Sequence, residues 1–317
     1  MNKDTTFTML VGLPASGKST FADSIKDRYS VFSSDALREE LFGDVNDQSH
    51  NNEVFNELHR RIDTSLKDHK SCVYDATNLS RKRRRAFLNT ISKYDYVSTI
   101  AIVFATDVET CLKRNSQRER VVPDEVILNF YKNLTIPRLE EGFDVIRIIP
   151  CKDKKYSLED YIRRMFNFNQ DNPHHTLTLD NHCMLASASV GTDEIRLATL
   201  IHDIGKPDCK TYLKKNGEMD DHAHYCNHAE VGAYLYACSM SHELALWKDY
   251  STFVTSKTNR DIMNMLLIQY HMDFYGLPKD DNGDVKINDF LEKLSKIYGN
   301  TFSEYLKELH IADMMAH

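Results

Sequence analysis

The sequence predicts an α/β domain with a mainly parallel sheet, followed by an all-α domain. Short apolar runs alternate with helical patterns over residues 1–150, whereas helical patterns dominate over residues 173–317. Residues 151–172 connect the two as a linker or docking helix. A length of 317 residues suits two domains, each able to bury a core. The charges divide in the same way: residues 1–150 hold 22 basic and 22 acidic residues, and the remainder holds 18 and 25.

The composition is that of an ordinary globular protein, with 41% hydrophobic and 27% charged residues. No apolar run approaches the ~20 residues of a membrane helix, and the N-terminus lacks the features of a signal peptide. We therefore expect a cytoplasmic protein without a membrane partner. Seven cysteines without a C-x-x-C pair predict reduced thiols, which excludes a disulfide scaffold and a zinc ribbon.

In the first half, each short apolar run predicts a strand and each periodic stretch a helix. This alternation is typical of a parallel sheet that is covered on both faces. The expected strands are 7–12, 30–33, 72–75, 97–105 and 145–149. The expected helices are 18–28, 35–42, 51–68, 80–93, 107–118 and 124–134.

Residues 12–19, GLPASGKS, match G-x-x-x-x-G-K-[ST] between a predicted strand and a predicted helix, the context that this phosphate-binding loop requires. Gly12 and Gly17 let backbone N–H groups surround phosphates, and the following helix adds a partial positive charge. Lys18 is placed for the β- and γ-phosphates of ATP, and Ser19 for Mg²⁺. The expected nucleotide-binding residues are Gly12, Ser16, Gly17, Lys18, Ser19, Thr20 and Arg114.

Polar residues follow two further predicted strands. Asp35 could accept a proton from an acceptor hydroxyl or serve as a helix N-cap, and both roles can coexist. Arg38, one turn later, could bind a phosphate of the acceptor. Asp75 could help to position Mg²⁺ or belong to a plain turn. We group Asn78 with Arg38 and Asp75 as candidate acceptor-binding residues.

Two groups of basic residues have open interpretations. Arg114 and Arg118 lie four apart on the predicted helix 107–118, so they could close over the transferring phosphate or form a solvated face. The basic run at residues 81–85 could be a solvated helix face or a contact for a nucleic-acid backbone.

The segments GLPASGKST, SSDALR, YDATNLSRKRRR and KRNSQRERVVPDEV, in this order, resemble the polynucleotide 5′-hydroxyl kinases of nucleic-acid repair. The likeness covers roughly residues 7–150. It implies transfer of the γ-phosphate of ATP to a 5′-OH end, with Asp35 as general base and Arg118 as the catalytic arginine of a lid. It further implies that Lys18 and Ser19 handle ATP and Mg²⁺, that Arg38 binds the acceptor's phosphate and that Asp75 supports the metal.

The second half predicts helices that carry metal ligands. Helical patterns cover 177–189, 193–204, 227–247, 260–271, 288–297 and 302–316. One apolar helix ends in His202-Asp203 and is stopped by Gly205. A buried Asp beside a His is costly without a partner, and a divalent ion is the natural one. The further candidate ligands are His182, His228, His271 and Asp313. Lys206 could contact a phosphate or form a salt bridge at the helix end.

The order H…HD…H…H…D, on His182, His202-Asp203, His228, His271 and Asp313, resembles the HD phosphohydrolase superfamily. The likeness spans roughly residues 173–317. It implies a phosphomonoesterase or phosphodiesterase with Asp203 as a catalytic ligand and one or two divalent metals of the group Mn, Fe, Co, Ni and Zn. One metal would be held by His182, His202, Asp203 and Asp313, and His228 and His271 would fit a second.

Together the two halves predict a bifunctional end-healing enzyme, with a 5′-kinase and a 3′-phosphatase or 2′,3′-cyclic phosphate phosphohydrolase. Its substrates would be RNA or DNA strand ends, with RNA repair the expected setting and a nucleic-acid ligase a functional partner. The alternative is a kinase of nucleosides, nucleotides or sugars fused to a nucleotide phosphohydrolase, because the kinase half has no strongly basic field. A non-catalytic ATP-sensing role is a third interpretation, opposed by the complete set of Lys18, Asp35 and Arg118.

Overall fold

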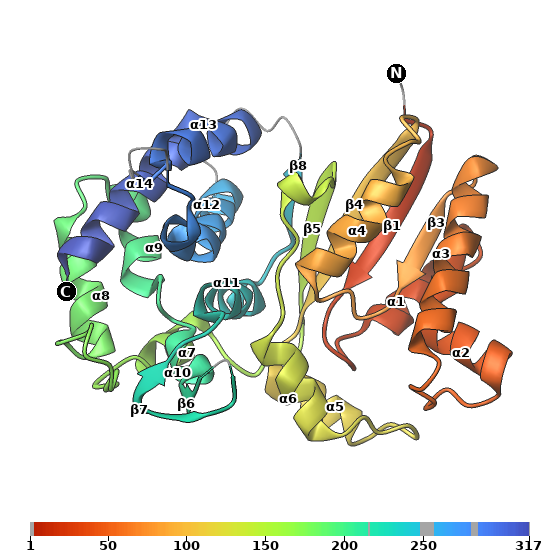
Figure 1. Ribbon diagram of the computed structural model, residues 1–317, viewed down its shortest axis with the longest axis horizontal. Coiled ribbons are helices and arrows are strands. Elements are labelled where there is room, and N and C mark those ends of the chain that lie inside the picture. Colours follow the sequence, from red (N-terminus) through yellow and green to blue (C-terminus); the bar gives the residue numbers. More distant parts are fainter. Residues whose placement is uncertain (1–2, 215, 248–256, 280–284, 317) are drawn as a thin grey trace. The chain divides into compact units, whose positions relative to one another are not determined.

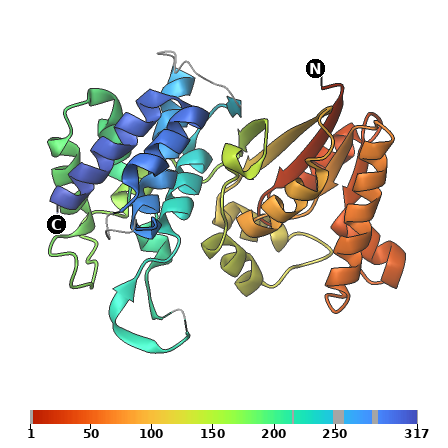
Figure 2. The ribbon, with the colours of Figure 1, turned by 45° about the horizontal axis from the view of Figure 1, so that its top comes forward.

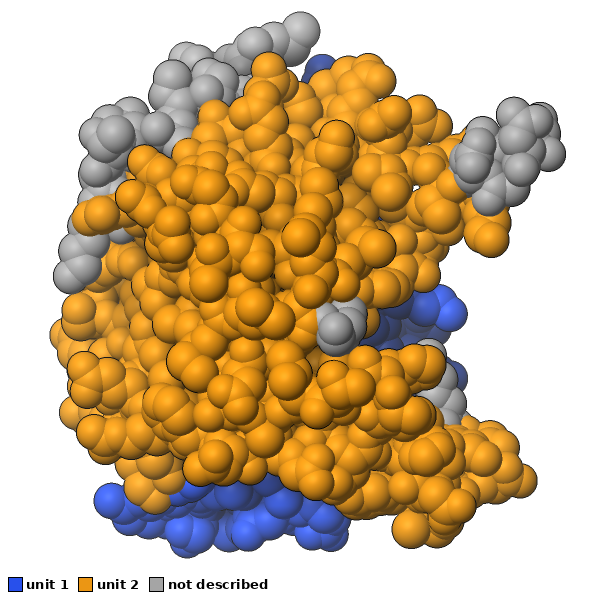
Figure 3. All heavy atoms as spheres, turned by 90° about the vertical axis from the view of Figure 1, so that its left-hand side faces the viewer, with its two compact units in different colours: residues 1–151, 245–247 blue, residues 152–244, 248–317 orange. Residues whose placement is uncertain are grey.

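A computed structural model describes residues 3–214, 216–247, 257–279 and 285–316. The chain divides into two compact units (Figure 3). Unit 1 comprises residues 1–151 with 245–247, and unit 2 comprises residues 152–244 with 248–317. Among the described residues, no helix combines the length and the apolar character that a membrane crossing would require.

Unit 1 is built on one sheet with the strand order β2-β3-β1-β4-β5-β8 (Figure 1). The pairs β2 with β3, β3 with β1, β1 with β4 and β4 with β5 are all parallel. The mainly parallel sheet expected from the sequence is therefore confirmed. The strands are β1 (Thr5–Val11), β2 (Ser30–Ser33), β3 (Cys72–Asp75), β4 (Val97–Ala105), β5 (Val145–Pro150) and β8 (Leu244–Trp247).

Helices cover both faces of this sheet. Phe7 of β1 contacts Phe87 of the fourth helix, while Leu10 clusters with Ala22 of the first helix. Because residues three apart in a strand point to opposite faces, these two helices lie on opposite sides. The helices of unit 1 are α1 (Lys18–Ile25), α2 (Ser34–Phe42), α3 (Asn51–Lys67), α4 (Arg81–Ile91), α5 (Val108–Asn115), α6 (Asp124–Lys132) and the short η1 (Leu139–Glu141).

The carboxyl ends of the parallel strands bring the predicted nucleotide residues to one edge. In the register of the sheet, Leu10 of β1 and Ser33 of β2 both pair with Asp75 of β3. The phosphate-binding loop follows β1, and α2 follows β2 directly. Ligands bind outside the carboxyl ends of strands in such sheets, so this edge is the candidate nucleotide site of unit 1.

Unit 2 is mainly helical: the long helices α8, α12 and α14 contact the short α9, and α11 packs against α12. Figure 2 shows the hairpin of β6 (Thr211–Leu213) and β7 (Met219–His224) extending from these helices. The helices are α7 (Leu158–Arg163), α8 (Leu179–Ser189), η2 (Asp193–Ile195), α9 (Arg196–Ile201), α10 (Lys206–Cys209), α11 (His228–Ser239), α12 (Lys257–Tyr270), η3 (His271–Gly276), α13 (Ile287–Tyr298) and α14 (Asn300–Met315).

Two expectations for the second half were wrong. The predicted helix 227–247 ends at Ser239, and Leu244–Trp247 forms β8 in the sheet of unit 1. A short apolar run does not by itself distinguish a buried helix from a strand. The β6–β7 hairpin was also missed, although Asn216-Gly217 is a hairpin turn signal and Gly217 has the positive φ of 87° that such turns require.

The structure explains the glycine at position 205 by close packing and not by the helix cap expected from the sequence. Its φ is −82°, so it is not a left-handed helix cap. A Cβ at this position would lie 2.2 Å from the His228 carbonyl oxygen and 2.6 Å from the Gly232 nitrogen. The absence of a side chain therefore lets the His202-Asp203 segment pack directly on the start of α11. This close approach brings His228 to Asp203.

Candidate functional site

The phosphate-binding loop of unit 1 has the backbone conformation that its glycines predict. Gly17 has a φ of 107°, in the left-handed region that favours glycine. A Cβ on Gly12 would lie 2.6 Å from the Ser16 hydroxyl oxygen, so a side chain there would displace the loop. Thr106 donates a hydrogen bond to the Ser16 carbonyl at 3.0 Å and fixes the other end of the loop. Thr20 lies exposed in the first turn of α1.

Lys18 folds back onto its own loop. Its ammonium donates hydrogen bonds to the carbonyl oxygens of Gly12 at 2.9 Å and Leu13 at 2.8 Å. Burial lowers the pKa of Lys18 to about 8, although the neighbouring charge of Asp75 opposes this shift. A buried ammonium that is hydrogen-bonded only to neutral oxygens favours an anionic ligand, because phosphates would compensate its charge.

Asp75 lies at the end of β3, beside Ser19 of the loop. Burial raises the pKa of its carboxyl, which the charge of Lys18 and a hydrogen bond with Ser19 partly counteract. This contact joins the two residues expected to hold Mg²⁺. Asn78, three residues after Asp75, has a φ of 49°, and its side-chain amide donates to the Leu10 carbonyl at 2.8 Å. Its amide thus ties the turn after β3 to β1.

A cleft of about 800 Å³ contains Ser19, Asp35, Asp75 and Arg118. Ser33 caps α2, because its hydroxyl accepts from the Ala36 N–H. The N-cap alternative for Asp35 is therefore wrong, and its carboxylate is left half-exposed at the cleft. Arg38, which is buried, donates to Asp35 Oδ1 at 2.9 Å. The structure thus brings the expected base and the expected acceptor-phosphate residue together.

The helical argument for Arg114 and Arg118 was wrong. Helix α5 ends at Asn115, because Ser116 and the residues after it form turns and bends up to Pro123. Arg114 lies in the last turn of α5 and donates to Cys151 Sγ at 3.1 Å. Arg118 lies beyond the helix, exposed at the cleft. The two arginines therefore do not share a helix face, although Arg118 reaches the expected place.

The basic run 81–85 divides into two kinds of residue. Arg84 is fully buried and makes a bidentate ion pair with Glu141, at 2.8 and 2.7 Å. It also donates to the carbonyl oxygens of Asn78 and Thr135. Arg84 therefore stabilises the fold, and its buried side chain is not accessible to a nucleic-acid backbone. Lys82, Arg83 and Arg85 are exposed.

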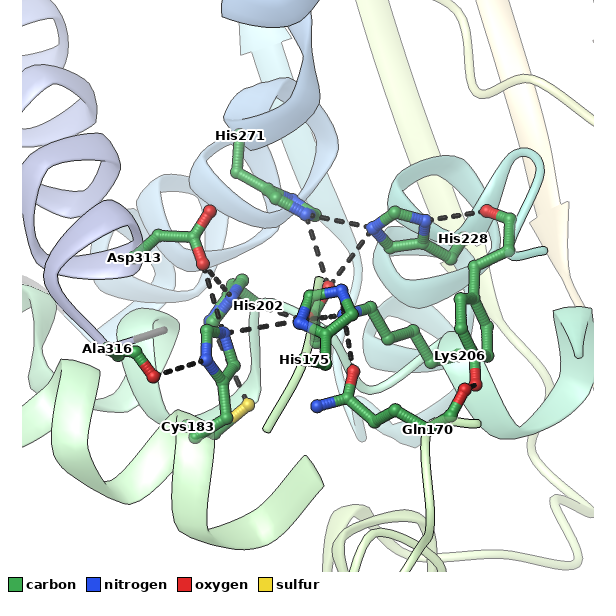
Figure 4. Close-up of polar contacts among 12 residues, drawn as sticks. Gln170, His175, Cys183, His202, Lys206, His228, His271, Asp313 and Ala316 are labelled. Atoms are coloured by element: carbon green, nitrogen blue, oxygen red, sulfur yellow. Dashed lines mark hydrogen bonds and ion pairs between the residues drawn. The ribbon is translucent and has the colours of Figure 1, made fainter. Parts of the chain in front are cut away.

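All six candidate metal ligands of unit 2 lie close together. Figure 4 labels four of them, His202, His228, His271 and Asp313. They come from five helical segments: α8, the residues directly after α9, the start of α11, the start of η3 directly after α12, and the last turns of α14. Each of them is at most 8% exposed. The ligands are His182, His202, Asp203, His228, His271 and Asp313.

The four histidines have the same tautomer-setting contact. Each Nδ1 lies against a backbone carbonyl oxygen, at 2.7 Å for His202, His228 and His271 and 3.2 Å for His182. Nδ1–H donation to a carbonyl leaves the Nε2 lone pair for a metal, and such outer contacts are typical of metal-binding histidines. The acceptors are the carbonyl oxygens of Thr199, Tyr225, Ile268 and Ala316.

Asp203 lies between two groups of ligands. Its Oδ2 lies 3.3 Å from His202 Nε2 and 3.7 Å from His182 Nε2. Asp313 Oδ1 lies 3.3 Å from His202 Nε2 and 3.0 Å from His182 Nε2. Its Oδ1 lies 3.1 Å from His228 Nε2 and 3.4 Å from His271 Nε2. One carboxylate therefore faces two groups of candidate ligands, one through each oxygen.

The electrostatics of this cluster favour cations. Burial alone would raise the pKa of the Asp203 carboxyl, but the charges of Lys206 and His202 hold it well below its ordinary value. Asp313 behaves in the same way, because His202 and His182 outweigh its burial and lower its pKa. Burial lowers the pKa of His271, which favours the neutral, metal-binding form. Nε2 of His202 is buried and makes no hydrogen bond within the described residues. This donor set fits divalent transition metals.

Three neighbours of the cluster complete its surroundings. Lys206 is buried and donates to Asp203 Oδ2 at 2.7 Å and to Gln170 Oε1 at 2.8 Å, so the salt-bridge interpretation describes its contact in this structure. His175 Nε2 lies 3.3 Å from the Lys206 ammonium. Sequence reasoning missed Gln170 and Cys183. Cys183 Sγ lies 3.9 Å from Nδ1 of His202, on the side of the ring opposite to the carboxylates.

The fold and loop define unit 1 as a P-loop domain, and a family comparison agrees. Residues 7–137 match the profile of a protein family described as an AAA domain. The chain is 23% identical over 203 residues to the L-seryl-tRNA(Sec) kinase of Methanococcus maripaludis, covering 62% of this chain and 77% of that protein. These two findings support a P-loop domain of the kinase type and a phosphotransferase activity.

Solved structures resemble the chain in part. A chain of the Pnkp1/Rnl/Hen1 RNA repair complex is 23% identical, with a TM-score of 0.35 and coverage of 41% of this chain and 44% of that chain. A gluconokinase from Sinorhizobium meliloti 1021 is 16% identical, with a TM-score of 0.32 and coverage of 44% and 79%. The matched part thus spans less than half the length of the RNA repair chain.

Proposed function

We propose that the chain is a bifunctional enzyme that heals nucleic-acid ends. Unit 1 would phosphorylate a 5′-hydroxyl with ATP, and unit 2 would remove a 3′-phosphate or open a 2′,3′-cyclic phosphate. The observation that carries the proposal is the pair of sites: a phosphate-binding loop with Asp35 and Arg38 at the same sheet edge, and a buried centre of four histidines and two aspartates.

In unit 1, the loop backbone and Lys18 bind the β- and γ-phosphates of ATP, and Ser19 with Asp75 holds Mg²⁺. Asp35 accepts the proton of the acceptor hydroxyl, whose oxygen forms the new bond to the γ-phosphorus. The bond between that phosphorus and the bridging oxygen breaks, and its electron pair leaves with ADP. Arg118 neutralises charge on the transferring group, and Arg38 binds a phosphate of the acceptor.

In unit 2, His182, His202, Asp203 and Asp313 would hold one divalent metal, and His228, His271 and Asp203 a second. Such metals, from the group Mn, Fe, Co, Ni and Zn, would polarise the phosphate ester and activate a water. Lys206 keeps the bridging carboxylate ionised and in place, since it donates directly to Asp203 Oδ2. It also lies where its charge could contact the phosphate.

The two reactions complement each other chemically. Phosphorylating one end and removing the phosphate from the other converts a broken strand into ends that a ligase can join. A nucleic-acid ligase is therefore the functional partner that the proposal implies. We favour RNA as the substrate, because one of the two end chemistries proposed for unit 2, the opening of a 2′,3′-cyclic phosphate, requires a 2′-hydroxyl.

A second candidate function follows from the sequence similarity to L-seryl-tRNA(Sec) kinase. In this alternative, unit 1 phosphorylates a hydroxyl of a small group, either free or attached to RNA, and unit 2 acts on nucleotides. The ATP chemistry is the same as in the first proposal. Only the acceptor differs.

An oligoribonucleotide with a 5′-hydroxyl and a 3′-phosphate, incubated with ATP and Mg²⁺ or Mn²⁺, tests the proposal at both ends. We expect a labelled 5′-phosphate and release of inorganic phosphate from the 3′ end. Lys18→Ala should abolish only the first product and Asp203→Ala only the second, with folding checked by circular dichroism. No change at either end, together with turnover of a nucleoside, a sugar or seryl-tRNA, would overturn the proposal.

A further inference from the structure

Both oxygens of the proposed general base are occupied in the ligand-free chain. Arg38 donates to Asp35 Oδ1 at 2.9 Å, and Arg120 donates to Asp35 Oδ2 at 2.8 Å. A carboxylate can accept the proton of an acceptor hydroxyl only if that hydroxyl reaches one of its oxygens. Each oxygen has a second lone pair, but a hydroxyl reaches Asp35 most directly where one of the two arginines gives up its contact.

The two arginines are held in similar ways but with different strength. Each guanidinium bridges Asp35 and an asparagine amide oxygen, Asn51 at 2.8 Å for Arg38 and Asn46 at 2.9 Å for Arg120. The Arg38 side chain is 4% exposed, whereas that of Arg120 is 31% exposed. Partly exposed ion pairs contribute little and exchange readily, so Arg120 is the one that can leave.

The position of Arg120 in the chain also favours its movement. It lies between α5 and α6, in a segment without helix or strand that also contains Arg118, which lines the cleft. Arg38, by contrast, lies within α2. A guanidinium released from Asp35 needs another anion, and the nearest one in a polynucleotide is the phosphate adjacent to the hydroxyl that has taken its place.

We propose that Arg120 is an acceptor-specificity residue that exchanges Asp35 for a phosphate of the acceptor. When the 5′-hydroxyl binds Asp35 Oδ2, Arg120 transfers its hydrogen bonds to a phosphate next to that hydroxyl, and Arg38 remains in place. The acceptor class is then a hydroxyl with a neighbouring phosphodiester or phosphomonoester. This inference rests on the proposed 5′-kinase activity and deepens it.

The test compares three acceptors with saturating ATP and Mg²⁺: adenosine, adenosine 3′-monophosphate and a 5′-hydroxyl oligoribonucleotide. We expect Arg120→Ala to lower kcat/KM for the two phosphate-bearing acceptors about 10- to 100-fold, mainly through KM. For adenosine we expect no loss, because the vacated Asp35 is more accessible. Arg163→Ala, which removes an exposed arginine paired only with Asp160 among the described residues, is the matched control and should change none of the three values.

Salt dependence gives a second readout that a merely structural role would not change. Each phosphate contact to a single strand adds about 0.7 to the slope of log affinity against log salt concentration, so Arg120→Ala should reduce the slope for the oligoribonucleotide by about that amount. An equal loss of kcat/KM on all three acceptors, or an unchanged slope, would overturn the role of Arg120. Wild-type protein that phosphorylates none of the three acceptors would instead overturn the proposed 5′-kinase activity itself.

Discussion

The two candidate sites differ in how their charged groups are arranged before any ligand binds. In unit 1 the side chains lie at the rim of an open cleft, and Asp35 and Arg118 are exposed there. In unit 2 all six candidate ligands are buried and lie within a few ångströms of one another. The proposed phosphate contacts of unit 1 are a backbone loop and one lysine, whereas the candidate metal ligands of unit 2 are side chains from five helical segments.

This difference matches two kinds of ligand. A nucleotide must enter and leave in each cycle, so its site stays open to solvent. Without a nucleotide, Lys18 donates hydrogen bonds to carbonyl oxygens of its own loop. A resident metal can repay a large desolvation cost, because carboxylates and imidazoles without a cation are expensive to bury. The predictions below test this contrast.

The largest effect is expected for Asp203→Asn. Because Asp203 faces both metal positions, its loss should remove bound metal and lower the phosphatase rate about 1,000-fold or more, while 5′-phosphorylation continues. Metal content by mass spectrometry and rates at both ends measure this. Asp193→Asn, at an exposed position of the same unit, is the matched control. Full metal content in Asp203→Asn would contradict the assignment.

The converse separation is expected for Lys18→Met. Removing the ammonium should lower the kinase rate about 100- to 1,000-fold, because one charge-stabilising donor is lost at the transferring phosphate. The phosphatase rate should stay at the wild-type value. Lys113→Met, at an exposed position on α5, controls for the loss of a positive charge. A parallel fall in both activities would show that the two sites are coupled.

ATP binding should depend on pH through Lys18. The pKa of this group is about 8 without ligand, and phosphates favour its charged form. Below pH 8 Lys18 already carries its proton before ATP binds. Above pH 8 the protein must take up a proton when ATP binds, so the Kd for ATP should rise by up to about tenfold per pH unit. Calorimetry at pH 8.5 in buffers of different ionisation enthalpy measures the uptake. If wild-type protein and Lys18→Met take up equal numbers of protons on binding ATP, the lowered pKa of Lys18 is not the cause of the pH dependence.

The smallest effect is expected for Cys183→Ser. The thiol lies within reach of His182, His202 and Asp203 but on the Nδ1 side of His202. We therefore expect it to lie outside the ligand set, so its replacement should change metal affinity less than about tenfold. Titration with Mn²⁺ or Zn²⁺ measures both affinity and stoichiometry. Loss of one bound metal per chain would place Cys183 among the ligands.

Local patterns in the sequence identified much of both sites. GLPASGKS between a strand and a helix located the loop, and His202-Asp203 in apolar surroundings located the cluster of candidate metal ligands, because each motif combines its chemistry with its context. The sequence did not separate Arg84, which is buried against Glu141, from its exposed neighbours. The sequence also did not predict the hydrogen bond from Arg120 to Asp35. A turn region has no regular repeat of side-chain directions from which such a contact could be inferred.

By itself, the sequence determined the two-part organisation, the parallel sheet of unit 1 and the identity of the candidate ligands, because these depend on short-range periodicity and residue chemistry. Only the tertiary structure decided which groups meet. The approach of Gly205 to Gly232, the convergence of five helical segments on Asp203 and the return of β8 to the first sheet join residues far apart in the chain. Such contacts depend on packing between elements, which no local pattern encodes.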